Sequence, residues 1–517
     1  MKEYLIKTLY LALLFCFPIV GCSKKNPTLT NPDNGYNKRN IYVAVNGNNG
    51  NKGDFQTPVK TIQKGLELVR PGDTVFVRQG VYREKVSFLK SGNNGAYITL
   101  MPYAEEKVVI SGEGLLVNGN EALVTMNAVS WIILQGFDIC DFKTHNAGAN
   151  VDGIVIKGSS GNIILRKNRV FNIENNASPE QGRSAHGIHI IGNTTVPIIK
   201  ILVENNEIFD CNTGYSENLT VNGYVDGFEI RNNKVYNGEN IGIVAAGGYA
   251  ANSTSSLNYA RNGVISGNEV YQIIGSSGPI PNYQGTYGAP AIYIDGAQNI
   301  IVERNKVHDN DRGIGVMSEN IGYPTANCII RNNFVYYNYT SGIYLGGYEG
   351  QSGGGGTNNC SFVNNTLFFN NIKSGYFGET EGEFRLKQGC TNNVFKNNII
   401  YARPDKGVFV NKENTGGSGN TFDYNLYYST GIYKWVWDAV PVSDFNKWKT
   451  VIGGDNNSNS DIDPQLVDIF LPNLHIAATS PAKNTGFLLP ISGDKDIDGE
   501  QRVFDTKIDK GADEVNP

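Results

Sequence analysis

Short apolar stretches followed by an asparagine recur along most of the chain. In each stretch, Ile and Val alternate with other residues before the step Asn-x-aliphatic, and successive asparagines stand 27 to 38 residues apart. The eight clearest copies begin at Asn168, Asn206, Asn233, Asn268, Asn305, Asn333, Asn365 and Asn398. Such alternation predicts strands, and a period of this length predicts a solenoid. Asparagine suits tight turns because it tolerates left-handed backbone geometry. We therefore expect an all-β solenoid whose asparagines stack at one turn.

The N-terminal part of this repeat has one segment with helical spacing. Ile62, Leu66 and Val69 fall on one face of a helix, between the strand patterns 41–45 and 71–77. A helix there would cover the first coil, which otherwise exposes its core and its strand edges. We expect residues 41–115 to form an N-terminal cap with the first coils, residues 116–428 the stacked coils, and residues 429–517 a C-terminal closing segment.

The C-terminal segment contains a possible cation loop. Asp494, Asp496 and Asp498 precede Gly499, as at the start of a calcium loop, and Asp505 takes the twelfth position. The pattern has no helices on either side, so a purely structural turn is the alternative. We assign no metal ligand and no cofactor, and keep calcium as the one candidate ion.

The cap and the tail together resemble the pectate-lyase-like superfamily of secreted right-handed parallel β-helix proteins. The resemblance implies a single right-handed parallel β-helix with an N-terminal helical cap. It implies little about chemistry, because lyases and hydrolases share this fold.

The first 22 residues have the pattern of an export signal. Lys2 and Lys7 flank an apolar run, residues 9–20, that ends in Ile-Val-Gly-Cys22. This ending resembles a bacterial lipobox, which implies that Cys22 becomes the lipidated first residue, with residues 23–40 as a tether. An ordinary signal peptide that contains a cysteine is the alternative. We expect an exported membrane lipoprotein, periplasmic or at the cell surface, that contacts the membrane through its lipid only.

The composition of the chain limits the classes of molecule that it can be expected to bind. A net charge of −5 leaves no electrostatic footprint for nucleic acid. The 61 Gly, 28 Tyr and 23 Phe suit tight turns, stacked strands and an aromatic surface. Beyond Cys16 and Cys22 five cysteines remain, an odd count that argues against a disulfide framework. We expect a monomer in which Cys328 and Cys360, each five residues before a repeat asparagine, stack as small buried side chains.

One strand pattern predicts a functional face. In segments such as 187–191, 291–295 and 342–346 the second and fourth positions are apolar and fill the interior, so the first, third and fifth face outward. This outward column holds Lys157, His189, Tyr293, Asp295, Tyr344, Glu383, Arg385 and Lys387. Rings stack on sugars, and charged groups bind hydroxyls and carboxylates, so the column predicts a polysaccharide-binding groove. Asp226 and Glu229, expected one coil earlier in the groove, and Tyr348, expected in a loop beside it, are added as flanking substrate-binding groups.

Two carboxylates in this region are candidates for catalysis. Asp295 and Glu319 are 24 residues apart, on adjacent coils, where their carboxyl groups could work as a glycosidase pair. Ile-Tyr-Ile-Asp295 followed by a glutamate resembles the β-helical retaining β-xylosidases. That resemblance implies that Asp295 is the nucleophile and Glu319 the acid/base. The alternative is that both cap turns or pair with Arg304 or Arg312.

Three functions remain open at this point. The first is a polysaccharide-degrading glycoside hydrolase. The second is a uronate lyase that uses Lys157, His189, Arg385 or Lys387, although the outward column has no aspartate cluster to hold calcium. The third is a non-catalytic surface glycan-binding protein. His186 and His189 are candidates for metal ligands or a base, with plain surface histidines as the alternative.

Overall fold

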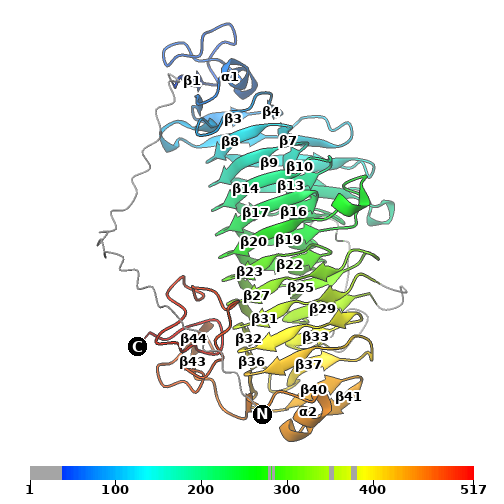
Figure 1. Ribbon diagram of the computed structural model, residues 1–517. Helices are drawn as coiled ribbons and strands as arrows, with labels where there is room; N and C mark the ends of the chain where they lie inside the picture. The colour runs from blue at the N-terminus through cyan, green and yellow to red at the C-terminus, as the bar shows by residue number, and fades with distance from the viewer. Residues whose placement is uncertain (1–37, 278–280, 282–285, 349–353, 374–380, 517) are drawn as a thin grey trace, which may run out of the picture. The chain divides into compact units, whose positions relative to one another are not determined.

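The computed structural model describes residues 38–277, 281, 286–348, 354–373 and 381–516. Over this range the chain is nearly all β and winds into a right-handed parallel β-helix, as predicted (Figure 1). Each coil contributes one strand to each of three long sheets, which we call A, B and C. Cys22 and the predicted signal and tether up to residue 37 lie outside the described residues.

Sheet A pairs its strands in parallel, in the order β1 (Asn40–Val43), β2 (Thr74–Val77), β5 (Ile98–Pro102), β8 (Ser130–Gln135), β11 (Gly161–Arg166), β14 (Ile198–Glu204), β17 (Val225–Arg231), β20 (Arg261–Ser266), β23 (Ile301–Glu303), β27 (Ile329–Arg331), β31 (Ser361–Val363), β35 (Val394–Lys396) and β38 (Thr421–Asp423).

Sheet B has the order β3 (Gly80–Tyr82), β6 (Val108–Ser111), β9 (Asp138–Thr144), β12 (Arg169–Asn175), β15 (Glu207–Phe209), β18 (Lys234–Gly238), β21 (Glu269–Ile273), β24 (Lys306–His308), β28 (Phe334–Tyr336), β32 (Thr366–Phe368), β36 (Ile399–Tyr401), β39 (Leu426–Tyr428) and β42 (Asn459–Ser460).

Sheet C, which carries the candidate site, has the order β4 (Val86–Phe88), β7 (Glu121–Asn127), β10 (Asn150–Lys157), β13 (Ser184–Gly192), β16 (Glu217–Gly223), β19 (Ile241–Ala246), β22 (Pro290–Asp295), β25 (Arg312–Ser318), β29 (Ile343–Gly347), β33 (Phe384–Leu386), β37 (Val408–Lys412), β40 (Lys434–Trp437) and β41 (Val440–Val442). Only its last pair, β40 with β41, is antiparallel among the described strands of the three sheets.

Smaller elements complete the described chain. A short sheet contains β26 (Thr325–Ala326), β30 (Thr357–Asn358) and β34 (Cys390–Thr391), and the C-terminal part holds the antiparallel pair β43 (Leu466–Asp468) and β44 (Asn473–Ile476). The helices are α1 (Ile62–Leu68), α2 (Phe445–Ile452) and three single 3-10 turns, η1 (Tyr103–Glu105), η2 (Pro179–Gln181) and η3 (Ser255–Leu257).

The repeated asparagines form one continuous ladder. Asn305 donates its backbone N–H and its side-chain amide to the side-chain oxygen of Asn333, both at 3.0 Å, and its amide also reaches the carbonyl of Ile265. The same bonds link all eight predicted asparagines and continue to Asn425. The left-handed residue is the one before each asparagine, for example Arg304 at φ 55°. The ladder therefore satisfies buried turn groups rather than supplying the left-handed position.

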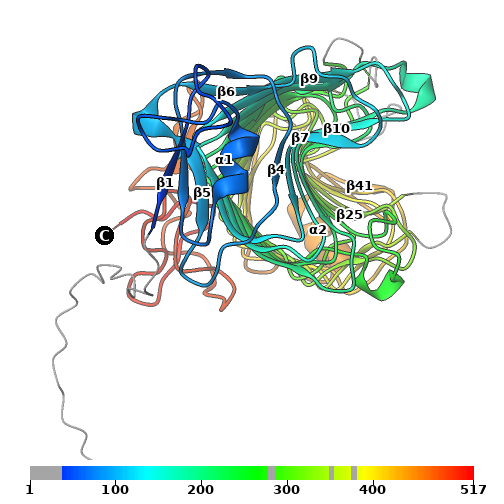
Figure 2. The ribbon, with the colours of Figure 1, turned by 90° about the horizontal axis from the view of Figure 1, so that it is seen from above.

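Both ends of the solenoid are covered. Helix α1, which begins with Thr61 as its side-chain cap, buries Ile62 and Leu66 and lies across the opening at the N-terminal end (Figure 2). At the other end α2 buries Trp448, which packs on Trp435 of β40 with ring centroids 5.9 Å apart. The predicted helical cap and closing segment are thus present.

The C-terminal residues beyond β42 turn back along the outside of the coils (Figure 1). The side-chain amides of Asn332 and Asn364 donate to the carbonyls of Ser492 and Asp509, and Ala512 donates to Thr366. The five described cysteines, Cys140, Cys211, Cys328, Cys360 and Cys390, are free and buried. Across the described part of the chain, no helix has the length and apolar character needed to cross a membrane.

Candidate functional site

The outer face of sheet C carries two neighbouring hollows. The central hollow has a volume of about 440 Å³, and its lining includes His186, Glu217, Tyr249, Asp295 and Glu319. The N-terminal hollow has a volume of about 390 Å³ and is lined from β7, β10 and β13. His189 and Ile191 line both, so the hollows share a wall. Together they follow the outward column predicted from the alternation.

Asp295, the last residue of β22, lies on the floor of the central hollow. It is 2% exposed, although it belongs to the outer face of the sheet. The backbone N–H of Glu319 donates to its Oδ1 at 2.9 Å, and the Tyr249 hydroxyl donates to its Oδ2. Both oxygens of this buried carboxyl are therefore held by donors from two other segments of the chain.

Glu319 follows β25 directly and stands beside Asp295, at the edge of the same hollow. Its Oε1 accepts hydrogen bonds from the hydroxyls of Tyr293 at 3.0 Å and Tyr348 at 3.2 Å. The hydroxyl of Tyr249 interacts with both carboxyl groups. The sequence prediction that Asp295 and Glu319 meet is therefore supported by their position. No ion pair links either one to Arg304 or Arg312 among the described contacts.

The surroundings change the acidity of Asp295. Burial, together with the negative charge of Glu319, raises the pKa of Asp295 well above its usual range. The hydrogen bonds from Tyr249 and from the Glu319 N–H act in the opposite direction, because they favour the anion. Asp295 therefore holds a proton at a pH where a lone exposed carboxyl would have lost it.

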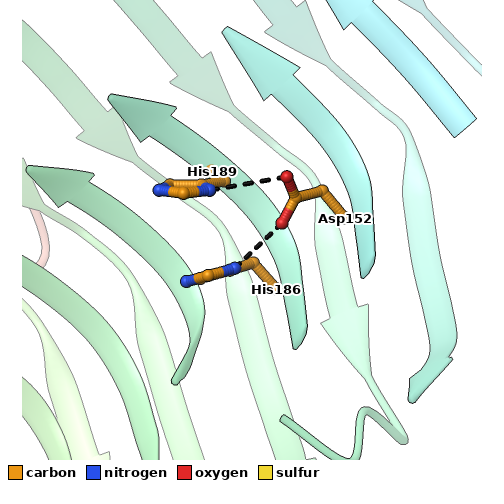
Figure 3. Close-up of side chains that lie close together, drawn as sticks. All are labelled: Asp152, His186 and His189. Carbon is orange, nitrogen blue, oxygen red and sulfur yellow. Dashed lines mark hydrogen bonds and ion pairs between the residues drawn. The ribbon is translucent and has the colours of Figure 1, made fainter. Parts of the chain in front are cut away.

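A second cluster, Asp152, His186 and His189, lies closer to the N-terminal end of sheet C, on the neighbouring strands β10 and β13 (Figure 3). Asp152 Oδ1 is 2.9 Å from Nδ1 of His186, and its Oδ2 is 3.5 Å from Nδ1 of His189. The two imidazole rings are stacked, with centroids 4.0 Å apart. On its other side, His186 Nε2 is 3.5 Å from Glu217 Oε2.

The groups of this cluster shift one another's pKa values in different directions. Burial would lower the pKa of His186, but its contacts with Asp152 and Glu217 raise it to about 9. Burial and the neighbouring His186 lower the pKa of His189. Burial would raise the pKa of Asp152, but the two histidines hold it below its usual range. Perturbed groups of this kind are typical of functional sites.

Several predicted substrate-binding residues line the hollows. Lys157 and His189 line the N-terminal hollow, and His189, Tyr293 and Tyr348 line the central one. Tyr344 packs on Tyr293, with ring centroids 6.0 Å apart, and is 2% exposed, so it supports the floor of the site.

Arg385 and Lys387 lie in the outward column of β33 and just beyond it, but both are buried. Arg385 Nη1 is 2.8 Å from a carboxyl oxygen of Glu381.

Three other predicted residues have different positions. Asp226 and Glu229 belong to β17 of sheet A, where Asp226 accepts from Asn262 and Glu229 pairs with Arg231. Asp226 and Glu229 therefore do not line the groove on sheet C, because the strand that their coil contributes to sheet C is β16. Glu383 accepts two hydrogen bonds from Asn370 and so ends a second, shorter asparagine ladder that runs through Asn310, Asn338 and Asn370. Its predicted contact with sugar is replaced by this structural role.

The segment of the predicted calcium loop forms a turn. Asp496 accepts the backbone N–H groups of Asp498 and Glu500, and Asp498 pairs with His475, outside the turn, at 2.6 Å. Calcium binding at this turn stays a prediction.

Sequence reasoning missed Asp152, Glu217 and Tyr249. Asp152 and His186 both precede a glycine, and the residue pairing of β10 with β13 passes directly from 152–186 to 154–188. A polar residue before such a glycine was the available signal for Asp152. Tyr249 lies in the segment after β19 and carries no such signal.

Comparison with known proteins places the chain in a fold class. The Pel9A-like right-handed β-helix region matches residues 41–253. The structure of XylC in complex with xylose superimposes with a TM-score of 0.53 at 15% identity, covering 92% of this chain and 98% of that one. The GH136 lacto-N-biosidase of Eubacterium ramulus gives 0.50 at 14% identity, covering 75% and 67%. The chain thus has the right-handed parallel β-helix fold that these proteins share.

Within this class, the chain belongs to the family of the uncharacterized protein YwoF of Bacillus subtilis. The two are 34% identical over 449 residues, which is 86% of this chain and 92% of YwoF. A shorter match, 32% identity over 77 residues, links it to the pectate lyase PEL9 of Emericella nidulans and covers 14% of this chain and 19% of that protein.

Proposed function

We propose that the protein is a glycoside hydrolase that binds a polysaccharide or oligosaccharide along the outer face of sheet C. The observation that carries this proposal is the pair Asp295 and Glu319, enclosed together in the central hollow and held by tyrosine hydroxyls. Two neighbouring carboxyl groups on either side of a glycosidic bond are the catalytic equipment of most glycosidases. The XylC complex with xylose and the lacto-N-biosidase, which share the fold, are in keeping with it.

The positions of the two groups suggest their roles. Asp295 sits on a rigid strand, where the N–H of Glu319 and the hydroxyl of Tyr249 stabilise its anion for attack on the anomeric carbon. Glu319 is more exposed and follows the strand, so it can give its proton to the leaving oxygen and later take one from water. Because Tyr249 interacts with both groups, they are close neighbours, which favours the retaining mechanism.

One proton on the pair reconciles these roles with the raised pKa of Asp295. Part of that rise comes from the charge of Glu319. When Glu319 carries the proton, as an acid must, this repulsion disappears and Asp295 ionises more easily. The reactive form of the enzyme then has an anionic Asp295 and a neutral Glu319.

The first test combines product analysis with a substitution. Incubation with a panel of polysaccharides should release reducing sugars without new ultraviolet absorbance. Asp295→Asn keeps the size of the side chain but removes the anionic oxygen, so turnover should fall by at least about 10³-fold while glycan binding persists.

Asp226→Asn is the matched control, because Asp226 lies on sheet A, away from the hollows, and its variant should keep wild-type rates. Wild-type turnover by Asp295→Asn on a substrate that the native protein cleaves would refute the catalytic role of Asp295.

A uronate lyase is the second candidate. It is favoured by the Pel9A-like match and by Lys157 and His189, which line the N-terminal hollow as possible base and carboxylate-binding groups. A lyase creates an unsaturated product that absorbs in the ultraviolet, so the same panel separates the two reactions. Binding without either product would point to a glycan-binding protein.

We also propose that the protein is exported and anchored through Cys22. The support is the sequence pattern of residues 1–22 alone, since these residues are outside the described structure.

A further inference from the structure

We infer that Asp152, His186 and His189 form a binding site for a divalent transition-metal ion of the zinc type. This inference is independent of the proposed hydrolase activity, because none of the three residues belongs to the catalytic pair. One ligand atom from each lies within 4.8 Å of the other two. The carboxylate oxygens are 2.9 Å and 3.5 Å from the Nδ1 atoms of His186 and His189. Such spacings suit atoms that share one ion at about 2.0–2.2 Å.

The backbone holds these three side chains in place before any ion binds. Asp152 of β10 pairs with His186 of β13, and His189 follows on the same strand and on the same outer face. Both strands lie inside sheet C, with β7 on one side and β16 on the other. The histidine rings are fixed by stacking at 4.0 Å, and their Nδ1 atoms both point toward Asp152 (Figure 3). Preorganised ligands of this kind lower the cost of binding an ion.

A buried nitrogen without a hydrogen bond points to the missing ligand. Nδ1 of His189 is inaccessible to solvent and has no hydrogen-bond partner among the described residues. Its contact with Asp152 at 3.5 Å does not supply one. Leaving a buried polar atom unsatisfied costs about 1–3 kcal/mol. An ion between the two Nδ1 atoms and the carboxylate would use the lone pair of His189. It would also replace the hydrogen bond between His186 and Asp152, and the Nδ1 proton of His186 would be released to solvent.

A second carboxylate stands beside Nε2 of His186, on the side away from Asp152. This Nε2 lies 3.5 Å from Oε2 of Glu217, and Thr220 donates a hydrogen bond to that same oxygen at 2.7 Å. A histidine that binds a metal through one nitrogen commonly donates the other N–H to a carboxylate, which fixes the tautomer. Glu217 is therefore a positioning residue for the site.

The donor set indicates the class of ion and its role. Two imidazole nitrogens and one carboxylate suit Zn²⁺ and related first-row ions, whereas Ca²⁺ and Mg²⁺ prefer oxygen ligands. Three protein ligands leave at least one position open. Since His189 lines both hollows, an open position there would face the groove. A hydroxyl or carboxylate oxygen of a bound sugar is the ligand that this position would take.

The test is direct titration of the purified full chain, stripped of metal, with Zn²⁺ by calorimetry and with Co²⁺ by visible absorption. We expect one ion per chain and, for Co²⁺, ligand-field bands of a nitrogen- and oxygen-ligated site. His189→Gln and Asp152→Asn should each weaken binding by more than about 100-fold, and Glu217→Gln by about 10- to 100-fold.

His308→Gln is the matched control, because His308 also lies between two carboxylates, Glu269 and Asp309, but on sheet B. It should bind like the wild type. Circular dichroism checks that each variant is folded. If a variant of one of the three ligands does not fold, the weaker binding expected of the conservative Glu217→Gln variant still tests the inference. No binding by the wild-type chain, or unchanged affinity in folded His189→Gln, would overturn the inference. Asp295→Asn should still bind the ion, so failure of the hydrolase proposal leaves this result unaffected.

Discussion

At the scale of single residues, Asp295 combines two features that oppose ionisation, complete burial and a second carboxyl group beside it. A nucleophile must nevertheless be ionised to react. The pKa of Asp295 reflects both demands and should be visible in the pH dependence of catalysis. Burial, Glu319 and Tyr249 are the main influences on it.

We predict that activity is lost toward acid at a pH well above the ordinary carboxyl range. The pKa of Asp295 is raised, so its reactive anion is lost as pH falls through that raised value rather than near pH about 4. The acid limb of a plot of kcat/KM against pH, measured on a substrate that the panel identifies, tests this. An activity that stays constant down to about pH 4 would contradict it.

Two substitutions should affect this limb differently. Glu319→Gln keeps a neutral side chain beside Asp295, as in the proposed reactive form, so the limb should stay near its wild-type position. Tyr249→Phe removes a hydrogen bond that favours the anion, so the limb should shift to higher pH. Activated aryl glycosides are the substrates of choice, because they need little help from an acid and remain measurable in Glu319→Gln. A limb that moves in Glu319→Gln, or that stays in place in Tyr249→Phe, would contradict the protonation states proposed for Asp295 and Glu319.

At the scale of elements, the asparagine ladder links the turns of successive coils through side chains alone. Asn305 is fully buried and bonds to Asn333, to Ile265 and, as acceptor, to Asn268. We predict that Asn305→Ala lowers the free energy of unfolding by roughly 3 kcal/mol, because several buried partners lose their hydrogen bonds together.

Chemical denaturation followed by circular dichroism measures the effect of Asn305→Ala. Asn127→Ala is the control, since Asn127 is exposed at the end of β7, and it should change stability by less than about 0.5 kcal/mol. Equal effects of the two variants would mean that the ladder contributes little to stability.

The elements also explain which predictions from sequence succeed. The interior apolar positions, the ladder and α1 are local patterns, and each is found where the sequence predicts it. The allocation of strands to sheets is not local. The segment 225–229 alternates like a strand of sheet C but belongs to sheet A, which is why Asp226 and Glu229 were misplaced. Tyr249 reaches Asp295 from another segment, a contact that no spacing in the sequence reveals.

At the scale of the whole molecule, the predicted lipid anchor would hold the protein at a membrane and so limit which glycans it can reach. We predict that Cys22→Ser abolishes lipidation, since the thiol that would carry the lipid is gone. Membrane fractionation and metabolic labelling with a fatty acid provide the measurement. A variant that still partitions with membranes and takes up label like the native chain would show that the cysteine is not the anchor.

The stacking of coils also fixes the distances between functional groups along sheet C, in multiples of one strand spacing. His189, Thr220, Val244 and Tyr293 occupy one column on four successive strands, so the histidine cluster and the carboxyl pair are three strand spacings, or about 14 Å, apart. Inserting or deleting a coil between them would change that separation by one strand spacing, about 4.8 Å, and leave each cluster intact. The length of glycan that spans both would then change in steps rather than continuously.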